Sequence, residues 1–215
     1  MRDDGDRGPN TSGMGAYSPA PVVTRELHER IMQQVIEPTV RGMAADGRPY
    51  AGFLYAGLMI TCAGEPKVLE FNCRFGDPET QPILMRMRSD LVELCLGALS
   101  GRLDRCRIDW DVRSALGVVL AAEGYPGPVR KGDPISGLDA ALLPEIKIFH
   151  AGTAQDDGGI VTAGGRVLCV TALGQGIREA GELAYRAVEQ VHWRGMFYRR
   201  DIGHRALARE QSAKN

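Results

Sequence analysis

The chain has 215 residues, of which 44% are hydrophobic and 25% charged, so it is long enough for one large domain or two small ones and has the composition of a globular protein. Its 26 basic and 27 acidic side chains give a net charge of -1, which argues against a nucleic-acid partner because a polyanion binder needs a basic surface that releases counterions. Five scattered cysteines without a C-x-x-C pair indicate reduced thiols in a cytoplasm, and the absence of a long apolar run or an apolar leader argues against a membrane location and export.

The first predicted element is a loop over residues 1–21, which is rich in Gly, Pro, Asn, Ser and Asp and has no apolar periodicity. Thr24 then predicts an N-cap for a helix over 25–45, whose apolar residues recur at helical spacing. Pro38 lies inside that helix, so we expect a kink or a restart there.

A β-hairpin is predicted next, with strands over 52–62 and 67–72 joined by the turn Ala63-Gly-Glu-Pro. A single helix is expected over 80–100, and Gly101 is a suitable residue to end it.

The pattern changes after about residue 105, where short β-like runs alternate with Gly- and Pro-rich turns. One further helix is predicted over 176–192. We therefore expect two domains, residues 1–104 and 105–215. The strands predicted in the second domain cover residues 113–123, 145–150, 160–163 and 166–172.

The first candidate site is the glycine-rich segment from Gly5 to Gly15, which reads Gly-Asp-Arg-Gly-Pro-Asn-Thr-Ser-Gly-Met-Gly. Glycines let backbone N–H groups approach a ligand closely, as a phosphate-binding loop requires. The segment is neither a P-loop nor a dinucleotide fingerprint. A flexible tail is the alternative, and the density of specific residue types favours a functional loop.

The second candidate site is the strand that carries Glu70 and Asn72, followed by Arg74. Alternate side chains of a strand share a face, so the carboxylate and the amide oxygen are expected to point the same way. Hard oxygen donors of this kind suit magnesium on nucleotide phosphates. Arg74 would continue on that face and place a positive charge near a transferring phosphoryl group. The alternative is an edge strand with a solvated polar face.

Both motifs resemble those of phosphoribosylamine–glycine ligases, which are ATP-grasp enzymes of purine biosynthesis. The matching stretches are Asp6-Arg-Gly-Pro-Asn-Thr-Ser-Gly-Met-Gly-Ala-Tyr-Ser-Pro-Ala-Pro and Glu70-Phe-Asn-Cys-Arg-Phe-Gly-Asp-Pro-Glu-Thr-Gln. The resemblance covers nearly the whole chain through Gly124-Tyr-Pro-Gly, Lys131-Gly-Asp, Phe149-His-Ala-Gly-Thr, Gly164-Gly-Arg-Val-Leu and Tyr198-Arg-Arg-Asp-Ile-Gly. It implies an α+β fold: the second lobe of an ATP-grasp domain, then a small β-rich domain with one helix.

The resemblance also implies a reaction in which ATP phosphorylates glycine and 5-phosphoribosylamine displaces the phosphate, giving glycinamide ribonucleotide. It makes Glu70 and Asn72 the ligands of Mg²⁺ (or Mn²⁺), and Arg74 and Asp77 the catalytic pair, with Asp77 orienting Arg74 and the loop rather than acting as a base. The residues that it assigns to substrate and nucleotide binding are Asp6, Pro9, Asn10, Thr11, Gly13 and Gly15.

Two departures from the family pattern concern single positions. Ser12 replaces the second residue of the usual Thr-Gly-Gly-Met-Gly, which would cause strain if that position needs a positive φ. Many relatives carry an acidic residue on the preceding strand, whereas residues 56–60 offer none, so a second metal ion would depend on Glu70 and phosphate oxygens.

A larger departure is that the N-terminal domain and the first ATP-grasp lobe of the family have no counterpart here. We therefore expect a C-terminal portion that is inactive alone, a monomer unless a separate N-terminal half joins it. Another ATP-grasp purine ligase and a non-catalytic binding remnant remain alternatives. Arg199 and Arg200 are expected on a solvated face, with contact to a substrate phosphate as the less favoured reading.

Overall fold

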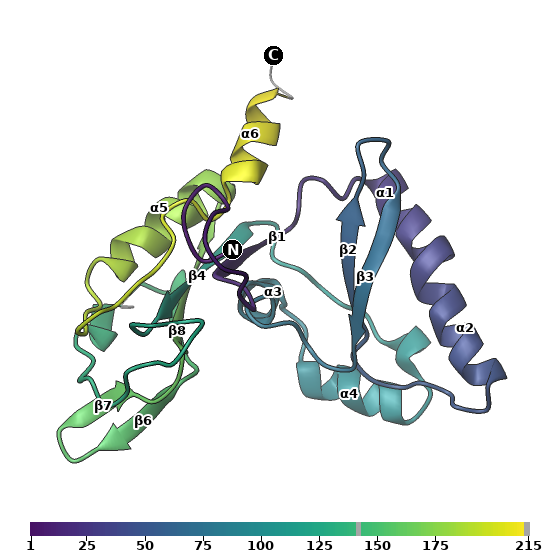
Figure 1. The fold of residues 1–215 in the computed structure, drawn as a ribbon. Helices are drawn as coiled ribbons and strands as arrows, with labels where there is room; N and C mark the ends of the chain where they lie inside the picture. The colour runs from purple at the N-terminus through teal and green to yellow at the C-terminus, as the bar shows by residue number, and fades with distance from the viewer. Residues whose placement is uncertain (141–142, 213–215) are drawn as a thin grey trace. The chain divides into compact units, whose positions relative to one another are not determined.

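The computed structural model describes residues 1–140 and 143–212, and it confirms a mixed α+β fold (Figure 1). The chain forms two compact units. The sheet unit comprises Met1–Pro19, Asp77–Met87 and Trp110–Asn215, and the hairpin unit comprises Ala20–Gly76 and Arg88–Asp109. Each unit is built from separate segments, so the units do not follow a single cut between residues 104 and 105, and the predicted domain assignment stays a prediction.

The sheet unit is organised around a four-stranded antiparallel sheet in the order β1-β4-β8-β5. The two central strands are almost entirely buried because their sequences, SALGVVLA and RVLCVTALG, are nearly continuous apolar runs. The strands are β1 (Gly15–Ser18), β4 (Ser114–Ala121), β5 (Ile146–His150) and β8 (Arg166–Gly174).

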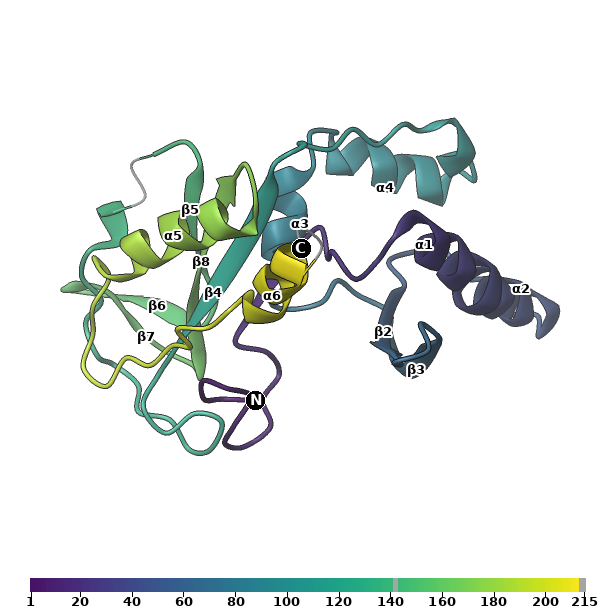
Figure 2. The ribbon, with the colours of Figure 1, turned by 90° about the horizontal axis from the view of Figure 1, so that it is seen from above.

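Helices cover both faces of this sheet. The helix α5 (Ile177–Val188) packs its apolar residues on the face that carries Leu116 and Val118, which are fully buried. The helix α3 (Thr80–Arg86) lies on the other face, where a Cβ atom added to Gly117 would lie 3.6 Å from Cδ of Pro82. Figure 2 shows α5 lying across the strands. Each buried Leu or Val contributes about 1.5–3 kcal/mol to this core.

Four elements of the sheet unit were not predicted: the strand β1, the strand β6 (Thr153–Asp156), the 3-10 helix Leu138–Ala140 and the helix α6 (His204–Ser212). The strand β6 pairs with β7 (Gly159–Thr162) in a hairpin. The expectation of a single helix after residue 105 was therefore incomplete. No helix among the described residues has the length and apolar character of a bilayer span.

The hairpin unit begins with the helical run predicted over 25–45. Thr24 caps it, with its hydroxyl accepting a hydrogen bond from the Leu27 N–H at 3.2 Å. The predicted irregularity near Pro38 takes the form of a π-helical turn, because Pro38 has no N–H to donate and the Glu37 N–H bonds to the Met32 carbonyl instead. The segments are α1 (Arg25–Ile31), a π-helix (Met32–Ile36) and α2 (Glu37–Ala45).

The predicted hairpin is confirmed as β2 (Tyr55–Ile60) and β3 (Pro66–Asn72), which pair in antiparallel register. The single helix predicted over 80–100 was wrong. The structure has α3 and a separate α4 (Leu91–Leu99), because Met87 is extended and Asp90 starts a new helix by accepting a hydrogen bond from the Val92 N–H at 2.7 Å.

Candidate substrate loop and metal-binding strand

The two oxygen donors predicted as metal ligands lie on one face at the end of β3. In the antiparallel register Glu70 pairs with Gly57 and Asn72 pairs with Tyr55, and the only shift in register falls beyond Gly57. A Cβ atom added to Gly57 would lie 3.1 Å from Cγ of Glu70. The glycine therefore leaves the space that the Glu70 side chain occupies across the hairpin.

This donor set matches magnesium better than a transition metal. Glu70 is exposed and Asn72 half-buried, so neither residue is sealed in the core. Among the described residues no three His, Cys, Asp or Glu side chains gather as a metal cluster. Magnesium usually takes one or two protein oxygen ligands and completes its shell with water and phosphate oxygens, so the pair suits a phosphate-bound magnesium ion.

Arg74 does not continue the strand, contrary to expectation. The strand ends at Asn72, and Arg74 lies in the bend that follows, where it is exposed. Its Nη1 donates a hydrogen bond to the Phe75 carbonyl at 2.9 Å, and the Phe75 ring stacks on Phe53 with centroids 4.0 Å apart. The guanidinium thus lies beside the end of β3, but Arg74 itself does not have the extended backbone of that strand.

The predicted substrate loop lies in the sheet unit and has a defined backbone. Gly5, Gly8 and Gly13 have positive φ angles, and Asp6 shares this left-handed conformation with φ 56°. A Cβ atom added to Gly13 would lie 2.5 Å from Cδ of Pro78, so the loop packs closely there. Ser12 is not among the residues with positive φ, so its replacement of the family glycine carries no backbone strain.

The middle of the loop is held partly by its own polar groups. The Asn10 side-chain oxygen accepts a hydrogen bond from the Thr11 N–H at 3.1 Å, and the Thr11 hydroxyl accepts one from the Gly13 N–H at 3.3 Å. Pro9 and Asn10 are exposed. Gly15 begins β1 and pairs with Val118 of β4. The predicted binding residues therefore lie in one continuous segment that leads into the edge strand β1, and their role in binding stays a prediction.

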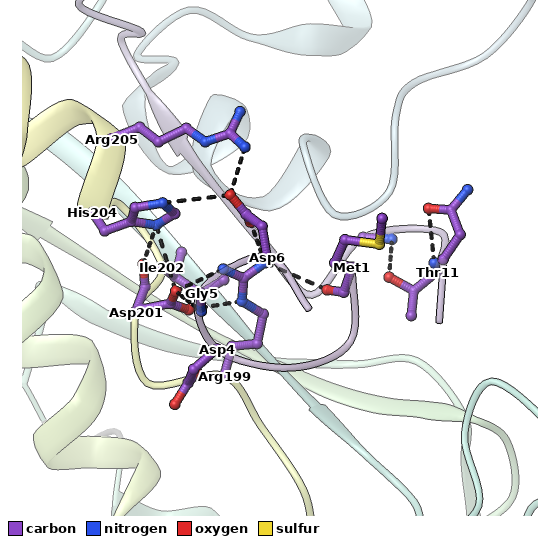
Figure 3. A network of polar contacts seen from close by, with 12 residues as sticks. Met1, Asp4, Gly5, Asp6, Thr11, Arg199, Asp201, Ile202, His204 and Arg205 are labelled. Atoms are coloured by element: carbon purple, nitrogen blue, oxygen red, sulfur yellow. Dashed lines mark hydrogen bonds and ion pairs between the residues drawn. The ribbon is translucent and has the colours of Figure 1, made fainter. Parts of the chain in front are cut away.

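The start of the loop is held by a charged segment near the end of the chain (Figure 3). The Arg199 guanidinium donates to Asp201 at 2.7 and 2.8 Å and to Asp6 at 3.0 Å. The second carboxylate oxygen of Asp6 accepts from Arg205. Arg199 is buried, so the expectation of a solvated face is wrong for this residue.

These contacts set the charge states of the carboxylates. The hydrogen bond from Arg199 holds the pKa of the Asp201 carboxyl far below its usual range, with the Gly5 N–H adding to the effect. The hydrogen bond from Arg205 lowers the pKa of Asp6, and Arg199 lowers it further. Both groups are therefore anions at neutral pH, each paired with an arginine.

A polar cavity of about 240 Å³ opens beside these pairs. It is lined by Asp6, Gly15, Tyr17, Arg199, Asp201, Ile202, Gly203, His204 and Arg205. Acidic and basic side chains balance in its wall, so it lacks the net positive charge of a simple phosphate site.

Asp77 lies in the sheet unit, where a second arginine, Arg166, links it to the loop. Arg166 donates to the Asp77 carboxylate at 2.8 Å and to the Asp77 carbonyl at 2.7 Å. The same guanidinium donates to the carbonyls of Ser12 and Gly13 at 2.9 and 3.3 Å. The other Asp77 oxygen accepts from Gln81 at 3.1 Å. Asp77 is therefore linked to the loop through Arg166, and its expected role in orienting Arg74 stays a prediction.

The sequence interpretation missed Arg166, Arg199 and Asp201 as residues that shape the loop. Arg166 had two visible signals: it is a charged residue at the start of a mostly apolar strand, and it lies in the family-like stretch that begins at Gly164. For Arg199 and Asp201, the available signs were the charged run Arg199-Arg200-Asp201 and its place in the family-like stretch that begins at Tyr198. The two predicted groups, the loop and the strand β3, belong to different compact units.

Two family models match the chain. The model described as "Phosphoribosylglycinamide synthetase, ATP-grasp (A) domain" matches residues 2–80, and "Phosphoribosylglycinamide synthetase, C domain" matches residues 115–205. The chain is 67% identical to a phosphoribosylamine–glycine ligase of Allochromatium vinosum over 98% of its own length and 49% of that protein. It is 64% identical to a ligase of the same name from Vibrio vulnificus, over 97% and 48% of the two chains.

Solved structures agree with this assignment. A crystal structure of phosphoribosylamine–glycine ligase from Thermotoga maritima superposes with a TM-score of 0.82 at 40% identity, covering 93% of this chain and 49% of that one. The biotin carboxylase domain of a thermophilic 2-oxoglutarate carboxylase superposes with a TM-score of 0.61 at 15% identity, covering 86% and 41%, and shares the fold alone. The chain thus belongs to the phosphoribosylamine–glycine ligase family and spans about half the length of the curated relatives it matches.

Proposed function

We propose that the chain carries the metal-binding strand and the substrate loop of an ATP-dependent ligase that joins glycine to 5-phosphoribosylamine. The products are glycinamide ribonucleotide, ADP and phosphate. The proposal is supported by the family match over both halves of the chain and by the identity to ligases of that name. Because the chain covers about half of those relatives, we propose that it is inactive without the other half.

The observation that carries the proposal is the pair of oxygen donors on one face of β3, opposite a glycine. Glu70 and Asn72 would hold Mg²⁺ or Mn²⁺, and Gly57 leaves the room that the carboxylate needs. Bound there, such an ion would neutralise phosphate charge and favour phosphoryl transfer.

The remaining residues have positioning and electrostatic roles in this proposal. The glycine carboxylate takes the γ-phosphoryl group of ATP, and ADP leaves. The amine of 5-phosphoribosylamine then attacks the acyl carbon: a C–N bond forms, the C–O bond to phosphate breaks, and the amine proton passes to solvent. Arg74 stabilises negative charge on the transferring phosphoryl group. Asp77, which is bound to Arg166, positions the loop and does not act as a base.

The loop supplies substrate contacts. We propose that the N–H groups of the loop and the side chains of Asp6, Asn10 and Thr11 face glycine and 5-phosphoribosylamine, and that Pro9, Gly13 and Gly15 fix the backbone. The exposed position of Pro9 and Asn10 supports this role. A cytoplasmic monomer is the proposed state, and the free thiols of all five cysteines are compatible with a reducing compartment.

The experiment supplies ATP, Mg²⁺, glycine and 5-phosphoribosylamine to the purified 215-residue chain and measures phosphate release. We expect no release from the chain alone. We expect release when the half of the Allochromatium vinosum ligase that this chain does not cover is co-expressed with it. Failure of this pair, with the complete Allochromatium vinosum enzyme active in the same assay, would support a non-catalytic remnant instead.

In the active pair, Glu70→Gln should lower kcat by at least about a hundredfold, because the lost charge acts in phosphoryl transfer rather than in binding alone. The matched control is Glu65→Gln in the turn of the same hairpin, where Glu65 is exposed and pairs only with Lys67 at 3.0 Å among the described ion pairs. The control should retain wild-type kcat. If Glu70→Gln and Glu65→Gln have equal kcat values, Glu70 is not a ligand of the metal.

A further inference from the structure

The start of the substrate loop is attached to a segment that follows it by almost the whole length of the chain. The Gly5 N–H donates to the Asp201 carboxylate at 2.8 Å, and the Arg200 N–H donates to the Asp4 carboxylate at 2.8 Å. Arg199 adds the contact to Asp6 and a longer one, 3.4 Å, to the Met1 carbonyl. Four of the first six residues are thus bonded to residues 199–201.

Arg199 is the centre of this attachment. Its side chain is 8% exposed, and all three guanidinium nitrogens have an acceptor. Two nitrogens form a fork on the carboxylate of Asp201, and the third reaches Asp6. Lysine cannot reproduce this arrangement, because a single ammonium group does not present a planar fork to one carboxylate while it contacts another.

The loop conformation at Asp6 needs such support. Asp6 is the only non-glycine residue with a positive φ among the described part of the chain, and this conformation is unfavourable for an L-amino acid. Its carboxylate is held from two sides, by Arg199 and by Arg205 of α6. The neighbouring Gly5 N–H is held by Asp201, which Arg199 itself orients. Arg199 therefore supports both residues of the turn, Asp6 directly and Gly5 through Asp201.

We propose that Arg199 is a positioning residue for the substrate loop: together with Asp201 it holds the Gly5–Asp6 turn in its left-handed conformation. The loop then presents the residues that follow Asp6 in one geometry before any substrate arrives, which lowers the ordering cost of binding. The link from this geometry to catalysis rests on the proposed ligase function, whereas the attachment itself does not.

Amide exchange by NMR on the 215-residue chain tests the attachment without any need for activity. In Arg199→Met the Gly5 amide should exchange at least about tenfold faster than in the wild type, since its acceptor loses the arginine that orients it. Arg199→Lys should fall between the two. Exchange of the β4 and β8 amides should stay unchanged in both variants.

The matched control is Arg200→Met, which alters the neighbouring arginine. Arg200 is exposed, and its side chain lies over the Tyr198 ring at 5.9 Å, while only its backbone N–H contacts the loop. This variant should keep wild-type exchange at Gly5. Unchanged Gly5 exchange in Arg199→Met would overturn the proposal. Equal acceleration of the Gly5, β4 and β8 amides would also overturn it, because it would show a general structural role.

A second measurement relates the loop to substrates in the active two-chain ligase. Arg199→Met should lower kcat/KM for glycine or 5-phosphoribosylamine at least about tenfold and leave KM for ATP within about twofold. Asp201→Asn should follow the same pattern. An equal fall in kcat/KM for ATP, glycine and 5-phosphoribosylamine, with an equal rise in KM for all three, would refute selective positioning. If the wild-type pair shows no ligase activity, the proposed function fails, and the exchange data alone decide whether Arg199 positions the loop.

Discussion

Replacing Arg166 with methionine is the sharpest stability test that the structure offers. The guanidinium makes four hydrogen bonds: to the Ser12 carbonyl, the Gly13 carbonyl, the Asp77 carbonyl and the Asp77 carboxylate, at 2.9, 3.3, 2.7 and 2.8 Å. Methionine keeps much of the apolar stem and removes every one of these donors. The variant therefore isolates the polar link between the loop and Asp77.

The expected loss is about 2–3 kcal/mol of unfolding free energy. A hydrogen bond contributes about 0.5–1.5 kcal/mol net, and the simple sum over the four bonds is the upper limit of the loss. The ion pair itself contributes less than about 1 kcal/mol, because exposed pairs are screened by solvent, and the Asp77 side chain is 48% exposed. The freed carbonyls also regain water at the surface, which keeps the total below the simple sum.

Urea unfolding followed by tryptophan fluorescence measures this loss. The chain has two tryptophans, Trp110 and Trp193, and both belong to the sheet unit. The control is Arg186→Met, in which an exposed arginine of α5 is changed and the free energy should stay within about 0.5 kcal/mol. If Arg166→Met also stays within that range at an unchanged denaturant slope, water replaces the four contacts without cost and the argument is refuted.

Two further predictions concern backbone strain and pH. Gly13→Ala should destabilise the sheet unit by at least about 2 kcal/mol, since φ is +114° and the new Cβ would lie 2.5 Å from Pro78. The control is Gly42→Ala in α2, where the added Cβ meets open space and should stabilise the chain by about 0.5–1 kcal/mol. Thermal unfolding followed by circular dichroism compares the two variants. Arg199 lowers the pKa of Asp201 in the folded state, so the stability that this carboxylate contributes is present above its unfolded pKa of about 3.9 and is lost as the pH falls through the lower folded value. Urea unfolding between about pH 7 and pH 2 should therefore show a shallower acid loss in Asp201→Asn than in the wild type, and equal slopes would contradict this assignment.

Local patterns predicted the elements whose structure depends on local residues. The apolar runs of β4 and β8, the helix that begins after Thr24 and the β2–β3 hairpin all followed from periodicity and capping. The helix over 80–100 failed because its apolar periodicity continues through a break. At this break the Arg88 N–H donates a hydrogen bond to the Asp109 carbonyl at 2.9 Å, and the local sequence pattern does not predict this contact.

The candidate site also has a part that was predictable from the local sequence and a part that was not. The shared face of Glu70 and Asn72 follows from strand alternation and needed no tertiary information. The strand β1 and the partners of the loop were not predictable, because they depend on residues far along the chain. Arg166 is 89 residues from Asp77, and Arg199 is 193 residues from Asp6. Arg74 was misplaced for a third reason, since strand periodicity does not reveal where the strand ends.

In the proposed function, the residues that would perform chemistry are separate from those that give them their shape. The Glu70–Asn72 pair lies on a local hairpin, so its geometry should survive changes in the last third of the chain. The predicted substrate loop carries its proposed binding residues within one short segment but takes its conformation from Arg166 near its end and Arg199 at its start. Substitutions at these two arginines should therefore alter the loop while leaving the Glu70–Asn72 face intact. A short segment such as the Gly5–Gly15 loop can thus be complete in sequence and still lose its geometry through a residue far along the chain.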